Sequence, residues 1–170
     1  AYSIASDGGG AAITGTGTIA TATDQVTGID VSALGDGTLT LTVALTDVPG
    51  NTGANATDTT TKDATAPAGY TVAFDQDPVN GANQTGVSFT FAAAEVGAGY
   101  AYSIASDGGG AAITGTGTIA TATDQVTGID VSALGDGTLT LTVALTDVPG
   151  NTGANATDTT TKDATAPAGY

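Results

Sequence analysis

Residues 1–70 and 101–170 are identical letter for letter, so the sequence repeats with a period of 100 residues. A repeat of this length is too long for a solenoid turn or a propeller blade, and it matches a small independent domain. Two copies under separate selection for distinct binding sites would have diverged. The identity therefore indicates a recently duplicated tandem array in which every module does the same general job.

The composition excludes several classes of functional site. There is no Cys and no His, so a Cys/His zinc site, a Ser-His-Asp triad and a thiol nucleophile are all excluded. Two lysines oppose 17 acidic residues, and the net charge of -15 would repel nucleic acids and anionic membranes. No run of 18 apolar residues predicts a membrane span. We expect no nucleic-acid partner, no membrane insertion, no small-molecule substrate and no enzymatic activity, because the one close carboxylate pair, Asp75 and Asp77, lacks an aromatic platform and a cationic partner.

Apolar and polar residues alternate with a period of two along most of the chain, which is typical of half-buried strands. The stretch "TLTLTVALT" at 138–146 places Leu and Val on one face and Thr on the other. Turn-forming stretches such as "SDGGG" and "DVPGNTG" separate the strands. We predict seven strands in one module, at 70–75, 86–92, 100–106, 112–120, 125–131, 138–147 and 154–162, and a bulge near Gly128 where the alternation shifts between Val126 and Ile129.

Seven short strands in about 100 residues predict an all-β fold, an immunoglobulin-like Greek-key sandwich repeated in tandem, without the disulfide and Trp of antibody domains. Pro67 cannot donate to a strand ladder, so "DATAP" at 63–67 predicts a short connection between modules. The predicted modules are then 1–64, which is partial and lacks the first two strands, 65–164, which is complete, and 165–170, which begins a following module. Loss of the second strand exposes the core face of its neighbours, so either another molecule supplies the missing strands or the sequence is a window onto a longer chain.

The stretches "AEVGAGYAYSI" and "GIDVSALGDGTLTLTVALTDVPGNTG" resemble the tandem bacterial Ig-like extender repeats of giant RTX-type surface adhesins, over the whole 100-residue period. The resemblance implies an extracellular stalk on a bacterial cell surface, of the kind involved in biofilm formation, in which Ca²⁺ between neighbouring identical modules stiffens the array. The glycine- and aspartate-rich RTX nonapeptides are absent, which favours a spacer over the secretion-signal region or the ligand-binding tip.

Oxygen ligands from Asp, Glu and Asn suit Ca²⁺. In an Ig-like topology, loops from two successive modules face one junction, where we expect calcium ligands at Asp63, Glu95, Asp147, Asn151, Asp36 and Asp7, with Asp163 repeating the role of Asp63 at the next junction. A second candidate is the "DQDPVNG" loop, with Asp75, Asp77 and Asn80. Two alternatives stay open: these residues are turn formers, and the acidity only keeps a long protein soluble.

Threonine-rich stretches leave a second function open. "TGTGTIATAT" and "TLTLT" resemble the Thr-x-Thr arrays of ice-binding surfaces, so outward Thr side chains on a flat sheet would bind ice or a glycan. The competing interpretation is that Thr is a common outward residue in twisted sheets.

Overall fold

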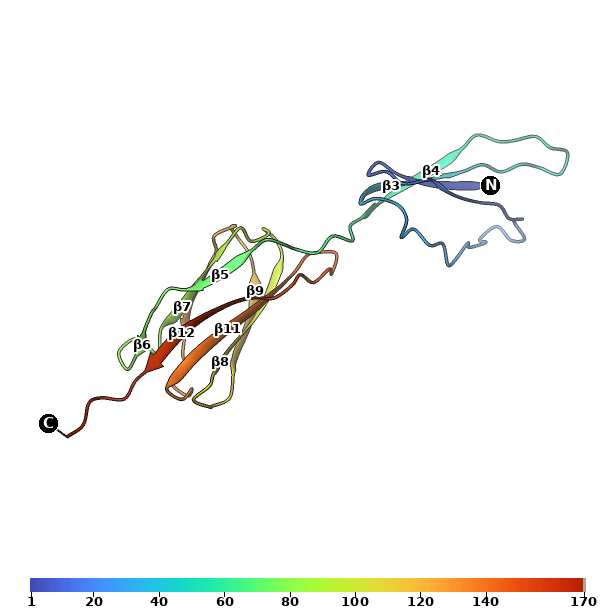
Figure 1. The fold of residues 1–170 in the computed structure, drawn as a ribbon. Helices are drawn as coiled ribbons and strands as arrows, with labels where there is room; N and C mark the ends of the chain where they lie inside the picture. Colours follow the sequence, from blue (N-terminus) through green and yellow to red (C-terminus); the bar gives the residue numbers. More distant parts are fainter. Residues whose placement is uncertain (170) are drawn as a thin grey trace. The chain divides into compact units, whose positions relative to one another are not determined.

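The computed structural model describes residues 1–169 and is all-β, which confirms the predicted class (Figure 1). No helix in this part of the chain is long and apolar enough to cross a membrane. The chain divides into two compact units, unit 1 at Ala1–Thr65 and unit 2 from Ala66 onward. The predicted bounds of a complete module, 65–164, and of the next module, beginning at 165, stay predictions.

Unit 2 contains two sheets, and every predicted strand overlaps an observed one. The three-stranded sheet has the order β10-β7-β5, and the five-stranded sheet has the order β6-β12-β11-β8-β9. The strands are β5 (Thr71–Phe74), β6 (Val79–Asn80), β7 (Val87–Ala92), β8 (Gly99–Ser106), β9 (Ile113–Thr118), β10 (Gln125–Ile129), β11 (Gly137–Thr146) and β12 (Ala156–Asp163). All pairs are antiparallel except β6 with β12, which are parallel. The two-residue β6 was not predicted, because it is too short to show a period.

The core of unit 2 lies between these two sheets. Phe89 and Phe91 on β7 belong to the same hydrophobic cluster as Leu141 and Leu145 on β11, and all four side chains are almost completely buried. The threonines that alternate with the β11 leucines point outward, as the period of two requires. The predicted bulge is confirmed, since the pairing of β10 with β7 shifts between Val126 and Ile129, and Gly128 there has a φ of 74°.

Glycines on β9 make room for tyrosine rings on the neighbouring strand. Tyr102 pairs with Gly115 and Tyr100 with Gly117, and a Cβ at either glycine would overlap the ring opposite. The Tyr102 ring packs edge-on against Phe89, with ring centroids 5.3 Å apart. The Gly-Thr-Gly-Thr pattern of β9 therefore extends the aromatic part of the core to the edge of the sheet.

Unit 1 has one sheet, although residues 1–65 have the same sequence as residues 101–165 of unit 2. Its order is β2-β1-β3-β4, with β1 (Tyr2–Ser6), β2 (Ile13–Gly15), β3 (Gly37–Val43) and β4 (Ala56–Lys62). Residues 25–29 form no strand, whereas the identical residues 125–129 form β10. The difference has a direct cause, because β10 pairs with β7, and unit 1 contains no segment equivalent to β7.

Candidate functional site

A cluster of three side chains closes the trailing end of unit 2, where the chain leaves β12. The Lys162 side chain is only 3% exposed, and its Nζ lies 3.0 Å from Oδ1 of Asp136. The Ala164 N–H donates to the same oxygen, and the Thr165 hydroxyl donates to Asp136 Oδ2 at 2.6 Å. The residues that follow β12 are thereby bonded to the loop before β11. We call Asp136, Lys162 and Thr165 the Asp–Lys–Thr cluster.

Unit 1 has the same cluster at Asp36, Lys62 and Thr65. Nζ of Lys62 lies 2.8 Å from Asp36 Oδ1, and the Thr65 hydroxyl donates to Asp36 Oδ2 at 2.7 Å. Hydrogen bonds from Lys62, then from Thr65 and Ala64, lower the pKa of Asp36 to about 2. Thr165, Ala164 and Lys162 hold the pKa of Asp136 still further below its usual range. Both carboxylates are therefore ionised at any physiological pH.

The leading end of unit 2 is fixed by Tyr70. Its hydroxyl donates to the Ala154 carbonyl at 2.6 Å and accepts the Leu145 N–H at 3.1 Å, so it joins the start of the unit to β11 and to the loop before β12. Pro67 is buried, and its carbonyl fills the space in which a side chain at position 153 would lie. Only glycine fits at that position.

The stretch "DATAP" at 63–67, which is predicted to connect the modules, is held by contacts at both of its ends. Thr65 is bonded within unit 1, and Asp63 accepts the Thr65 N–H through Oδ1. Pro67 packs within unit 2. A single residue, Ala66, separates the last side chain bonded to one unit from the first residue packed in the other. The stretch is therefore largely built into the two units.

Asp147 and Asn151 lie in the loop between β11 and β12 and bond to each other. Asp147 Oδ1 accepts the N–H groups of Gly150 and Asn151, and Oδ2 accepts the Asn151 side-chain amide at 2.7 Å. Burial raises the pKa of Asp147, but the hydrogen bonds from Asn151 and Gly150 outweigh it and lower the pKa overall. Asp147 thus closes its own turn. Glu95 is exposed in the turn between β7 and β8.

Asp7 lies beside the turn of Asp36 and Gly37 in unit 1, where a Cβ on Gly37 would overlap the Asp7 carboxylate. Its Oδ1 accepts the Thr38 N–H at 2.7 Å, one residue beyond Gly37. The equivalent Asp107 accepts the Thr138 N–H in unit 2. At the trailing end, Asp163 accepts the Thr165 N–H, as Asp63 does for Thr65. These carboxylates cap backbone donors in tight turns.

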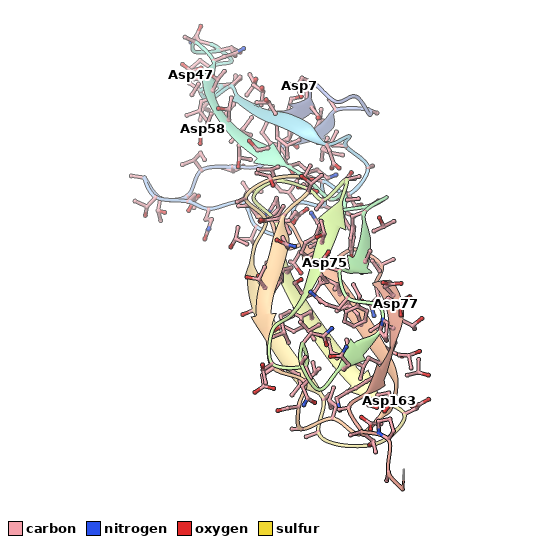
Figure 2. The ribbon with its side chains drawn as sticks, turned by 90° about the vertical axis from the view of Figure 1, so that its left-hand side faces the viewer. Asp7, Asp47, Asp58, Asp75, Asp77 and Asp163 are labelled. Atoms are coloured by element: carbon pink, nitrogen blue, oxygen red, sulfur yellow. The ribbon has the colours of Figure 1, made fainter. Side chains whose placement is uncertain are left out.

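The three predicted ligands of the "DQDPVNG" loop form hydrogen bonds with different parts of unit 2. Asp75 accepts the Thr90 hydroxyl and the Gln125 amide, on β7 and β10. Burial raises the pKa of Asp75, and hydrogen bonds from Ser88, Thr90 and Gln125 lower it overall. Asp77 accepts the Thr160 hydroxyl on β12, and Asn80 caps the Ala82 N–H. Figure 2 shows Asp75, Asp77 and Asp163 spread along unit 2.

Within each unit, the predicted ligands whose hydrogen bonds are described bond to donors of their own unit. In residues 1–169, no three acidic side chains come together in a group that would hold a metal ion. The structure assigns most of these carboxylates to turn capping and to the Asp–Lys–Thr clusters. Sequence reasoning missed the clusters, although a signal was present: the only two lysines occupy the same position of the repeat.

No protein-family model and no curated protein matches the sequence. Among solved structures, the chain is similar to one described as a crystal structure of a tetra-tandem repeat in the extending region of a large adhesion protein, with 28% identity and a TM-score of 0.46. The match covers 94% of this chain and 39% of that one. The chain thus spans less than half the length of that structure's chain.

Proposed function

We propose that the chain is part of the spacer region of a large bacterial cell-surface adhesin, in which extracellular modules joined end to end project a distal ligand-binding region. One observation carries the proposal: the chain comes into unit 2 at one end of the sandwich and leaves it at the other. Tyr70 bonds to Ala154 just before β12, and β12 ends at Asp163 beside Asn80. Figure 1 shows the C-terminal segment leaving the end opposite to the start of β5.

This arrangement makes every module add length. The nine residues from Ala154 to Asp163 span about 30 Å in extended conformation. With the short connection, a module would extend an array by roughly 40 Å. A fold whose two termini lay at the same end would add almost nothing.

The strand order supports an immunoglobulin-like Greek-key module as the repeating unit. The first, second and fifth long strands, β5, β7 and β10, form one layer, and β8, β11 and β12 form the other. These are the two layers of an immunoglobulin-like sandwich. The fourth long strand, β9, lies beside β8 instead of joining the smaller sheet, which is a variation on the seven-stranded arrangement.

The partners in this proposal are neighbouring identical modules, and two sources of stiffness act between them. One is the Asp–Lys–Thr cluster, which bonds the residues after the last strand to their own module and leaves a very short connection. The other is Ca²⁺ held by carboxylates of successive modules, which rests on the acidity of the chain and on the resemblance of the sequence. Within a unit the residues do not fit a calcium centre, and Asp36 and Asp147 would have to exchange hydrogen bonds for the ion.

Arrays of two, four and six complete modules test both parts. Small-angle scattering in millimolar Ca²⁺, in Mg²⁺ and in EDTA gives the maximum dimension, and thermal melts give the stability. The spacer proposal predicts a constant increment per module, and arrays that stay compact as modules are added would overturn it. The calcium part predicts that EDTA shortens the arrays and lowers the melting temperature. If the length added per module is the same in EDTA, the calcium part of the proposal is wrong and the spacer part stands.

A second candidate function is supported by the outward face of the five-stranded sheet. Thr140 on β11 lies directly opposite Thr159 on β12, and the pairs Thr138 with Thr161 and Thr142 with Thr157 continue the row. Such a row is the surface that an ice- or glycan-binding function would use, while the same pairs also stabilise a sheet through cross-strand contacts. Thermal hysteresis or glycan-array binding that disappears in Thr140→Ala/Thr159→Ala would favour binding. If the unaltered chain shows neither thermal hysteresis nor glycan binding, the spacer function is the one that is supported.

A further inference from the structure

The two sheets that the structure describes in unit 2 have four edge strands, and three of these carry a feature that hinders pairing with another chain. β6 is only two residues long and follows Pro78. The Phe74 N–H, at the end of β5, donates to Asp158 Oδ2 at 2.8 Å, so a side chain of β12 occupies this edge. β10 is interrupted by the bulge near Gly128. Short strands, prolines, bulges and inward charged side chains are the usual protection of sheet edges.

The fourth edge strand, β9, has none of these features. It ends the five-stranded sheet and pairs with β8 in one unbroken register from Ile113 to Thr118. Between Asp107 and Asp124 the sequence contains no charged residue and no proline. The outer side of β9 is therefore the edge of unit 2 to which another strand can be added.

This edge presents the backbone groups of three threonines. Directly after β9, the Ile119 N–H donates to the Ala98 carbonyl, and the Ile119 carbonyl accepts the Gly97 N–H, so both groups point toward the β8 side. Backbone groups alternate in direction along an antiparallel strand, so Gly115 and Gly117 also bond to β8. The groups that point away from β8 belong to Thr114, Thr116 and Thr118.

The sequence of β9 is complementary to itself. Residues 114–118 read Thr-Gly-Thr-Gly-Thr, which is symmetrical about Thr116. Two copies related by a two-fold axis can therefore pair antiparallel with like residues opposite each other. The chain has a net charge of -15, and the uncharged stretch lets two copies meet with no carboxylate of one strand opposite a carboxylate of the other.

We propose that β9 binds β9 of a second copy of this chain, antiparallel and with Thr116 opposite Thr116, so that two five-stranded sheets become one continuous sheet. The outward N–H and C=O groups of the threonines then bond across the contact. Their side chains are exposed and pair on the outer face, as Thr140 and Thr159 do within the module. The contact uses the side of the module and not its ends, so it goes beyond the spacer role and does not depend on it.

The opposite face of the new strand pair is filled by tyrosine rings. Gly115 comes opposite Gly117 of the second copy. The Tyr102 ring lies over Gly115, and the Tyr100 ring lies over Gly117. The pairing therefore brings Tyr102 of one copy beside Tyr100 of the other, which adds apolar contact to the backbone hydrogen bonds.

Sedimentation equilibrium of the full chain tests the contact. We expect a reversible dimer at high protein concentration, which becomes tighter as salt screens the repulsion between two acidic chains. Thr116→Asp places two carboxylates directly opposite each other and is expected to weaken the dimer several-fold. Thr140→Asp adds the same charge to β11, inside the sheet, and is the control. A chain that stays monomeric, or equal dimerisation of the two variants, overturns the proposal.

Single cysteines test the register, because the chain has no Cys of its own. In the proposed pair the two Cα atoms of residue 116 lie about 5.5 Å apart, which a disulfide can span. Thr116→Cys is therefore expected to form a disulfide-linked dimer faster than Thr140→Cys under mild oxidation. A mixture of Thr114→Cys and Thr118→Cys chains is expected to give mainly the mixed dimer. Equal rates at positions 116 and 140, or a statistical product from the mixture, overturns the proposal.

Discussion

The Tyr70 hydroxyl donates a 2.6 Å hydrogen bond to the carbonyl of Ala154, which fastens the first residue of the module core to the loop before its last strand. The same oxygen accepts the Leu145 N–H, so one buried phenol satisfies backbone groups of two segments more than 70 residues away. The leading end of the module is thereby defined by one side chain.

Tyr70→Phe tests this role. The substitution keeps the ring and leaves the Leu145 N–H and the Ala154 carbonyl without their partner, which costs roughly 1–3 kcal/mol. Amide exchange of β7 measures the effect in unit 2 alone, because residues 71–100 occur once in the sequence. Tyr102→Phe, which removes a hydroxyl from a ring that packs by its edge, is the matched control and is expected to cost clearly less.

One substitution at two identical positions tests whether residues 66–100 complete the module. Leu145→Ala removes a fully buried side chain and is expected to destabilise unit 2 by about 2–5 kcal/mol. Leu45→Ala removes its exposed counterpart and is expected to change the stability of unit 1 by no more than about 0.5 kcal/mol. Urea denaturation followed by circular dichroism measures both variants. Equal costs would show that the face of unit 1 is covered.

Gly115→Ala tests whether the Tyr102 ring packs directly over Gly115. The added methyl group overlaps the ring, which has to leave its contact with Phe89, at an expected cost of about 1–3 kcal/mol. Gly86 has open space around its Cβ position, so Gly86→Ala is a control with the same change in composition. If Gly115→Ala and Gly86→Ala lower the melting temperature by the same amount, the packing described for β8 and β9 is contradicted.

The Asp–Lys–Thr cluster predicts that the stability of the fold decreases at acidic pH. The pKa of Asp136 is lower in the folded chain than in the unfolded chain, where an aspartate titrates near 4. Its contribution is therefore complete above about pH 4 and decreases as the pH falls through the pKa of the folded state. Asp36 has a pKa of about 2, so its contribution to the stability of unit 1 is lost between about pH 4 and pH 2.

Asp136→Asn is expected to melt several degrees below the unaltered chain at pH 7, and the gap is expected to narrow as the pH falls from 4 to 2. Glu95→Gln removes the same charge from an exposed turn and provides the control, with a small effect at every pH. A gap that stays constant from pH 7 to pH 2 would mean that ionised Asp136 does not stabilise the fold.

The alternation of residues was enough to predict the long strands, because burial on one face imposes a period of two whatever the sheet order. Even the bulge near Gly128 follows from the shift between Val126 and Ile129. Residues 25–29 show the limit of this reasoning. They have the sequence of β10 and form no strand, since the ladder depends on β7, far away in the sequence.

The candidate site was less predictable, because the direction of a carboxylate depends on backbone donors that the sequence does not display. Asp147 sits in the predicted loop, yet its oxygens bond to Gly150 and Asn151 in the same turn. Asp36 was predicted as a calcium ligand and is the acceptor for Lys62 and Thr65. Whether calcium displaces these donors in an array stays a prediction.

The most direct test of the account is a distance measured across unit 2. The chain has no Cys, so Ala68→Cys and Asp163→Cys give two unique sites for spin labels at exposed positions. Electron-electron dipolar spectroscopy is predicted to give one narrow distribution near 30 Å, because the sites lie at opposite ends of β12. A distribution near the separation of two sheets, about 10 Å, would place both termini at the same end and contradict the spacer role.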